Sequence, residues 1–169
     1  VRATIAGMAT GFVPTNALAA GNMLEELLER HRLYDRAVAA ACALKAAQAQ
    51  ADEPIAAEAR ARLQGILLEA ARFNPALSPG VWRHCPDGGV IQRADGRPGA
   101  AIRPGSIVMV SILSALRDNP DGTQLIFGWG PHSCMGSRIA LEQIVETFAA
   151  LLSQPGLARS RGKFGWMQR

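Results

Sequence analysis

Residues 127–136 read FGWGPHSCMG, and this stretch decides what kind of fold the chain has. Its glycines and proline predict a loop. The apolar residues that follow recur at three- and four-residue steps, which predicts an amphipathic helix: Leu141, Ile144, Val145, Phe148 and Leu152. The loop therefore places Cys134 at the start of a helix, where the helix dipole and the unpaired backbone amides favour a thiolate.

Composition narrows the class of protein. The chain has 169 residues, of which 49% are hydrophobic and 19% charged, as in a globular domain rather than a disordered segment. Its net charge of +4, without a long basic run, argues against a nucleic-acid partner. No apolar run approaches the roughly 18–20 residues of a membrane span, and no leader is visible, so we expect a cytoplasmic protein. Three cysteines, an odd number, suit a reducing compartment.

Outside this loop, helical and strand patterns alternate with turn signals. Pro14 is expected to kink the first helix, and residues 103–106 (RPGS) suit a type II turn. Together the patterns predict one unit over residues 1–169, mainly α with a small antiparallel β part (α+β). The expected helices cover 1–33, 36–51 and 55–72, and the expected strands cover 81–85, 90–93 and 106–113.

The loop resembles the haem-binding loop of the cytochrome P-450 superfamily, whose pattern is F-x-x-G-x-[HR]-x-C-x-G. All of the specified positions match, at Phe127, Gly130, His132, Cys134 and Gly136. The resemblance implies that these residues bind haem b, with Cys134 as the axial thiolate ligand of the iron and His132 on a haem propionate. A thiolate in that position pushes electron density towards O–O cleavage.

Two other interpretations of Cys134 stay open. It could be a small buried hydrophobe, as most lone cysteines are. It could also join His84, Cys85 and His132 in a zinc site, although the spacing fits no regular zinc module.

A second signature is the E-x-x-R formed by Glu69 and Arg72, which share a helix face and can pair. It resembles the family's structural pair, which implies that the two residues lock the core around the haem loop. The family adds an arginine from a longer meander, and residues 117–127 provide no obvious counterpart. Arg83, in the next strand, resembles the arginine that contacts a haem propionate; the alternative is an exposed strand residue.

The first helix resembles the family's central helix, which carries A/G-G-x-[D/E]-T beside the oxygen site. Two registers are possible, residues 6–10 (AGMAT) and 11–15 (GFVPT), and the second is preferred, which assigns Thr15 to the oxygen side. The acid is absent from both, replaced by Ala9 or Pro14. Alternatively, Thr15 is an ordinary helix threonine bonded to its own backbone.

The resemblance implies an incomplete cytochrome P-450-like fold, the carboxy-terminal portion of a bacterial-type enzyme. The implied activity is a monooxygenase that inserts one atom of dioxygen into a small apolar organic substrate, with electrons from a ferredoxin or flavin reductase. A basic face at Arg138, Arg159, Arg161 and Lys163 could dock such an acidic partner. The missing acid motivates an alternative, a peroxide-dependent oxygenase or hydroperoxide isomerase. A further alternative is a non-catalytic haem-binding or structural fragment.

Overall fold

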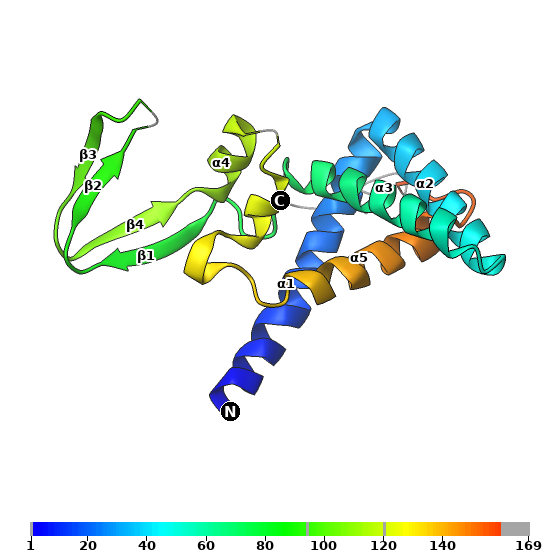
Figure 1. Ribbon diagram of the computed structural model, residues 1–169, viewed down its shortest axis with the longest axis horizontal. Coiled ribbons are helices and arrows are strands. Elements are labelled where there is room, and N and C mark those ends of the chain that lie inside the picture. Colours follow the sequence, from blue (N-terminus) through cyan, green and yellow to red (C-terminus); the bar gives the residue numbers. More distant parts are fainter. Residues whose placement is uncertain (1, 94, 120, 160–169) are drawn as a thin grey trace.

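The computed structural model describes residues 2–93, 95–119 and 121–159, with side chains from residue 11 onward. The chain is mostly helical with a small antiparallel β part, which confirms the predicted α+β composition (Figure 1). The helices are α1 (Arg2–Glu29), α2 (His31–Ala49), α3 (Glu53–Ala71), α4 (Ile112–Asp118) and α5 (Ser137–Leu152), with 3-10 turns η1 (Thr123–Phe127) and η2 (Gly130–His132). The strands are β1 (Val81–Cys85), β2 (Gly89–Gln92), β3 (Pro98–Ile102) and β4 (Ser106–Val110).

Helices α1, α2, α3 and α5 pack around one hydrophobic core. Helices α2 and α3 each contact the other three. Helix α3 begins where the Asp52 side chain accepts a hydrogen bond from the amide of Ile55 at 3.2 Å. The side chains that meet in the core come from all four helices and are at most 2% exposed: Leu27, Leu44, Leu63, Ile66, Leu67 and Phe148.

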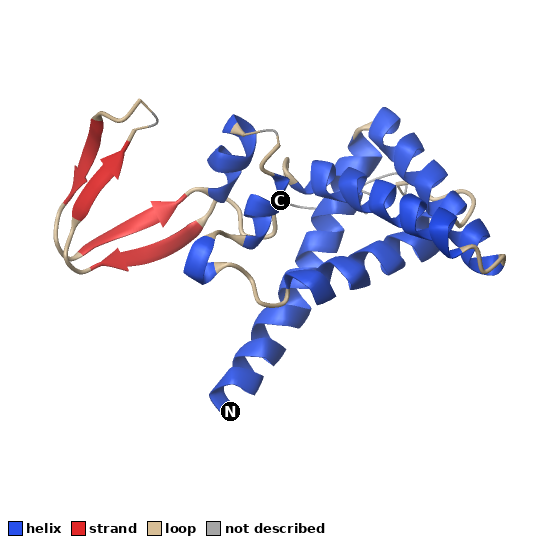
Figure 2. Cartoon of the chain, viewed as in Figure 1, coloured by secondary structure: helices blue, strands red, loops and turns tan. Residues whose placement is uncertain are grey.

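The strands form an arm that projects from the helical body (Figure 2). Strands β1 and β4 pair antiparallel, with Val81 opposite Val110, and β2 pairs with β3 in a second two-stranded sheet. The turn before β4 is the predicted one. Gly105 has φ +76°, and the amide of Ser106 donates to the carbonyl of Arg103 at 3.2 Å.

The boundary between the first two helices differs from the prediction. Helix α1 ends at Glu29 rather than at residue 33, and α2 begins at His31 rather than at residue 36. Arg30 alone leaves the helical conformation, with φ −113° and ψ 78°. Its amide still donates to the carbonyl of Glu26 at 3.1 Å, and its carbonyl accepts from the amide of Tyr34 at 2.9 Å, so the two helices join without a loop.

The region after β4 also corrects the prediction. The strand expected over 106–113 ends at Val110, because Ser111 begins α4 by accepting a hydrogen bond from the amide of Ser114 at 3.1 Å. Helix α4 and strand β3 were not predicted. Among the described residues, none of the helices combines the length and apolar character that crossing a bilayer requires.

Candidate functional site

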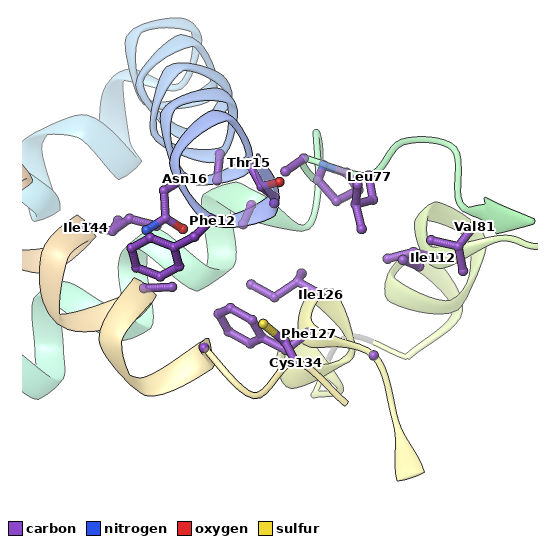
Figure 3. A pocket seen from close by; sticks show the side chains of 18 of the residues that line it. Phe12, Thr15, Asn16, Leu77, Val81, Ile112, Ile126, Phe127, Cys134 and Ile144 are labelled. Atoms are coloured by element: carbon purple, nitrogen blue, oxygen red, sulfur yellow. The ribbon is translucent and has the colours of Figure 1, made fainter. Parts of the chain in front are cut away.

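A cavity of about 410 Å³ lies among α1, the segment after α3, β1 and the loop before α5 (Figure 3). This volume falls in the range of roughly 300–1,000 Å³ that is typical of small-molecule and cofactor sites. Most of its lining is apolar, from residues such as Phe12, Leu77, Val81, Ile126 and Ile144. The predicted site residues in the lining are Thr15, Arg83, Phe127, His132, Cys134 and Gly136.

Short backbone hydrogen bonds shape the loop that carries Cys134. Its amide donates to the carbonyl of Phe127 at 2.7 Å, which folds the loop back on itself. Gly128 and Gly130 have φ of +76° and +65°, a left-handed conformation that favours glycine. Gly130 is not among the lining residues, so its role in the structure is to form the loop. Helix α5 then begins at Ser137, three residues after the cysteine.

The Cys134 thiol is exposed, and Figure 3 shows its sulfur directed into the cavity, with Thr15 on the opposite side. The interpretation of Cys134 as a buried hydrophobe is therefore wrong. The zinc site is wrong as well, because within the described residues no three His, Cys, Asp or Glu side chains gather as metal ligands.

Three further side chains reach the cavity from different elements. Arg83, on β1, is exposed and donates to the carbonyl of Trp82 at 2.9 Å, and it lines the cavity together with His132 of η2. Thr15 lines the cavity from α1. The side chains of the alternative register, residues 6–10, lie outside the described residues.

Glu69 and Arg72 do not form the predicted pair. The Glu69 carboxylate instead accepts from Arg36 of α2 at 3.2 Å, and both side chains are largely exposed. Arg72 donates through Nε and Nη2 to the carbonyl of Leu116, at 3.2 and 3.0 Å. The two side chains therefore act separately: Glu69 links α3 to α2, and Arg72 links α3 to α4, which adjoins the cavity through Ile112.

The predicted basic face is only partly present. Arg138 is exposed at the start of α5. Arg159 is turned towards α1, where its guanidinium lies 3.5 Å from a carboxylate oxygen of Glu29, so its charge is compensated. Arg161 and Lys163 lie outside the described residues.

Sequence reasoning missed the residues of α1 that share the cavity wall with Thr15. Phe12 and Asn16 both line the cavity, and Asn16 donates through Nδ2 to Oε1 of Gln143 at 3.1 Å, which joins α1 to α5. Helical spacing could have identified both residues, because positions 12 and 16 lie on the same helix face as Thr15.

The arrangement brings one thiol, one hydroxyl, one imidazole, one guanidinium and the amides of Asn16 and Asn74 to the wall of a mostly apolar cavity. A thiol is a soft ligand that suits iron, and the guanidinium and imidazole suit carboxylates. Comparison of the sequence with protein-family models and with curated proteins yields no match.

Proposed function

We propose that this chain binds haem b through the Cys134 thiolate, in a cytochrome P-450-like fold, and is a haem-thiolate monooxygenase acting on small apolar organic substrates. The observation that carries the proposal is the position of Cys134. It follows a glycine-containing loop that leads into α5, and its sulfur lines an apolar cavity opposite Thr15.

The residues of the cavity fit haem in three respects. Cys134 offers one soft ligand directed into an apolar space. Arg83 and His132 line the same space and suit the two propionates as charge-assisted hydrogen-bond donors. Gly136 presents no side chain beside the sulfur: a Cβ placed there would lie 3.8 Å from Sγ of Cys134.

When bound, haem would supply the activation of oxygen, and the Cys134 thiolate would favour O–O cleavage. Proton transfer and substrate binding would depend on side chains of the protein. The Thr15 hydroxyl can hold a water and pass a proton from Oγ1 on the wall opposite the thiol. Apolar residues such as Ile126 and Leu77 offer the contacts that bind an apolar substrate. Electrons would come from a ferredoxin or flavin reductase.

One feature of α1 favours a second candidate, peroxide-dependent oxygenation or hydroperoxide isomerisation. Position 14, where an acid is expected beside Thr15, is a proline inside the helix. Proline supplies neither an acidic side chain nor an amide hydrogen, so α1 has no proton donor at position 14. Because a peroxide is already a reduced form of dioxygen, its use as oxidant requires fewer protons from the protein. Turnover with hydrogen peroxide but not with reductase and dioxygen would favour the second candidate.

The full chain, supplied with haem, reduced and exposed to carbon monoxide, tests the ligand assignment. We expect a red-shifted, thiolate-type Soret band that disappears in Cys134→Ala. Cys42→Ala is the matched control, because Cys42 is also exposed but lies on α2, outside the cavity. Failure of the wild type to take up haem, or an unchanged band in Cys134→Ala, would contradict the proposal. Haem uptake without turnover under either oxidant would indicate a non-catalytic haem-binding protein.

A further inference from the structure

Arg30 connects the end of α1 to the segment that follows α3. Its guanidinium carbon lies 3.8 Å from the centroid of the Phe73 ring, which is a cation–π stack. Its Nη2 atom also lies 3.0 Å from a carboxylate oxygen of Glu26, one turn earlier on α1, and the Glu26 side chain is only 4% exposed. Because Arg30 is the residue between α1 and α2, the stack ties that junction to the end of α3.

Both partners of Arg30 adjoin residues that line the cavity. Glu26 lies one helical turn after Met23, which lines the cavity and is 2% exposed. Steps of three and four residues place Met23, Glu26 and Arg30 on one face of α1. On the other side of the stack, Phe73 is followed directly by Asn74, which also lines the cavity. The stack therefore adjoins the inner end of the cavity, where α1 and the segment after α3 meet.

The wall formed by residues 74–77 is held mainly at its two ends. In the part of the chain that the structure describes, residues 74–78 make no hydrogen bond of their own. At the far end, the carbonyl of Pro79 accepts from the amide of Leu113 at 3.1 Å and from the hydroxyl of Ser111 at 3.3 Å. At the near end, the ring of Phe73 lies under Arg30. The stack is thus one of the contacts that fix this wall relative to α1.

We propose that Arg30 is a positioning residue of the cavity: by stacking on Phe73, it keeps the wall of residues 74–77 in the position that binds the occupant. The inference deepens the proposed function and rests on it for the identity of the occupant, haem. Without the stack, the wall also adopts positions that do not bind, and the apparent dissociation constant rises as the binding-competent fraction falls. The two side chains are about 40% exposed, and a stack of that exposure shifts such an equilibrium by about fivefold.

Haem titration of the full chain, followed by the visible spectrum, measures this effect. We expect Arg30→Ala to raise the dissociation constant for haem about fivefold. Phe73→Leu should raise it by the same factor, because it removes the ring and leaves Arg30 paired with Glu26. Phe73→Tyr keeps the ring and should bind haem as the wild type does. Since one contact is lost in each case, the double variant Arg30→Ala with Phe73→Leu should bind no more weakly than either single variant.

Tyr34→Phe is the matched control for a loss of stability alone. The Tyr34 hydroxyl donates to the carbonyl of Leu157 at 2.9 Å, and neither residue lines the cavity. Urea unfolding should show a lower free energy of unfolding for Tyr34→Phe, with no change in its affinity for haem. Unchanged affinity in Phe73→Leu, or an equal loss of affinity in Tyr34→Phe, would overturn the assignment of Arg30.

Two further arms keep the outcome decisive. Where circular dichroism shows that Arg30→Ala is unfolded, the comparison of Phe73→Leu with Phe73→Tyr decides the question. If the wild type takes up no haem, the proposed function fails, and the role of Arg30 is decided in the haem-free chain with N-phenylnaphthylamine, an apolar dye that fluoresces on leaving water. Phe73→Leu should then weaken dye binding and Phe73→Tyr should not. Equal dye binding by both variants, or no dye binding by the wild type, would overturn the inference.

Discussion

Arg72 links two helices through a single carbonyl, and its removal provides the sharpest test of the structure. The carbonyl of Leu116 lies in the last turn of α4, and the residue four positions further on is Pro120, which has no amide hydrogen to offer it. Arg72 donates to this carbonyl through Nε and Nη2 at 3.2 and 3.0 Å. Leu116 is fully buried, so Arg72→Ala leaves a buried carbonyl at the end of a helix without its donor.

The expected cost follows from the geometry. Hydrogen bonds from a charged donor contribute about 1.5–3 kcal/mol, so Arg72→Ala should lower the free energy of unfolding by about 2 kcal/mol. Glu69→Ala should cost at most about 1 kcal/mol, the usual limit for exposed ion pairs. Its carboxylate pairs with Arg36, and the two side chains are 41% and 54% exposed. Since Glu69 and Arg72 share no bond, their effects should add.

Urea unfolding followed by circular dichroism, on both single variants and the double variant, measures the cost of each substitution and shows whether the two costs add. Equal costs for Arg72→Ala and Glu69→Ala, with a coupling above about 1 kcal/mol, would refute the reasoning and restore the pairing that the sequence predicts. The double variant of Glu69 and Arg36 is the matched control. It should show a small favourable coupling that weakens with added salt.

Three further predictions concern stability, each measured by urea unfolding. Burial raises the pKa of Glu146, but the hydrogen bonds and charges of Arg60 and Lys45 together outweigh it and lower the pKa from its ordinary value; the stabilisation is thus present above the ordinary pKa of a glutamate and lost as the pH falls through the lowered one, and Glu146→Gln should flatten that loss, by about 0.5–1 kcal/mol. Phe148, 1% exposed in the core, should cost about 3–5 kcal/mol when replaced by alanine; a cost under 1 would contradict the packing. Gly65→Ala, in open space on α3, should raise the free energy of unfolding by about 0.5–1 kcal/mol. Gly128→Ala should lower it, because Gly128 has φ +76° and an added Cβ would lie 3.1 Å from the carbonyl oxygen of His132. A change of the same sign in both variants would contradict this prediction.

Local patterns predicted the elements whose sequence alone determines them. The bounds of β1 were correct, and so was the apolar stripe of α5 except at Leu141, which is only half-buried, because periodicity and flanking turn residues are contained within each segment. Strand β3 was missed because its sequence, PGAAI, has little strand propensity, and its conformation depends on pairing with β2. Helix α4 was missed because the apolar run 107–113 suits either a strand or a buried helix, and only the cap at Ser111 separates them.

The site residues form the same two groups: those that the local sequence identifies and those whose contacts depend on tertiary packing. The two residues that the loop motif singles out, His132 and Cys134, line one cavity, because they are two positions apart on the same loop; their predicted role in binding haem stays a prediction. The partners of Glu69 and Arg72 could not be read from an i, i+3 spacing, since Arg36 and the carbonyl of Leu116 reach α3 only through tertiary packing. Phe12 belongs to this second group, because its place in the cavity wall depends on how α1 packs beside the loop.

The cavity lies between two parts of the molecule that differ in local stability. The helical body buries side chains such as Leu63 completely, whereas the strand arm leaves Trp82 and Ile107 at 65% and 71% exposure. Amide hydrogens of β1 should therefore exchange with solvent through local opening, while those of α3 exchange only when the whole chain unfolds. An occupant that touches both Val81 and Phe12 would couple the two parts. Slower exchange at β1 should then report occupancy before any rise in melting temperature does.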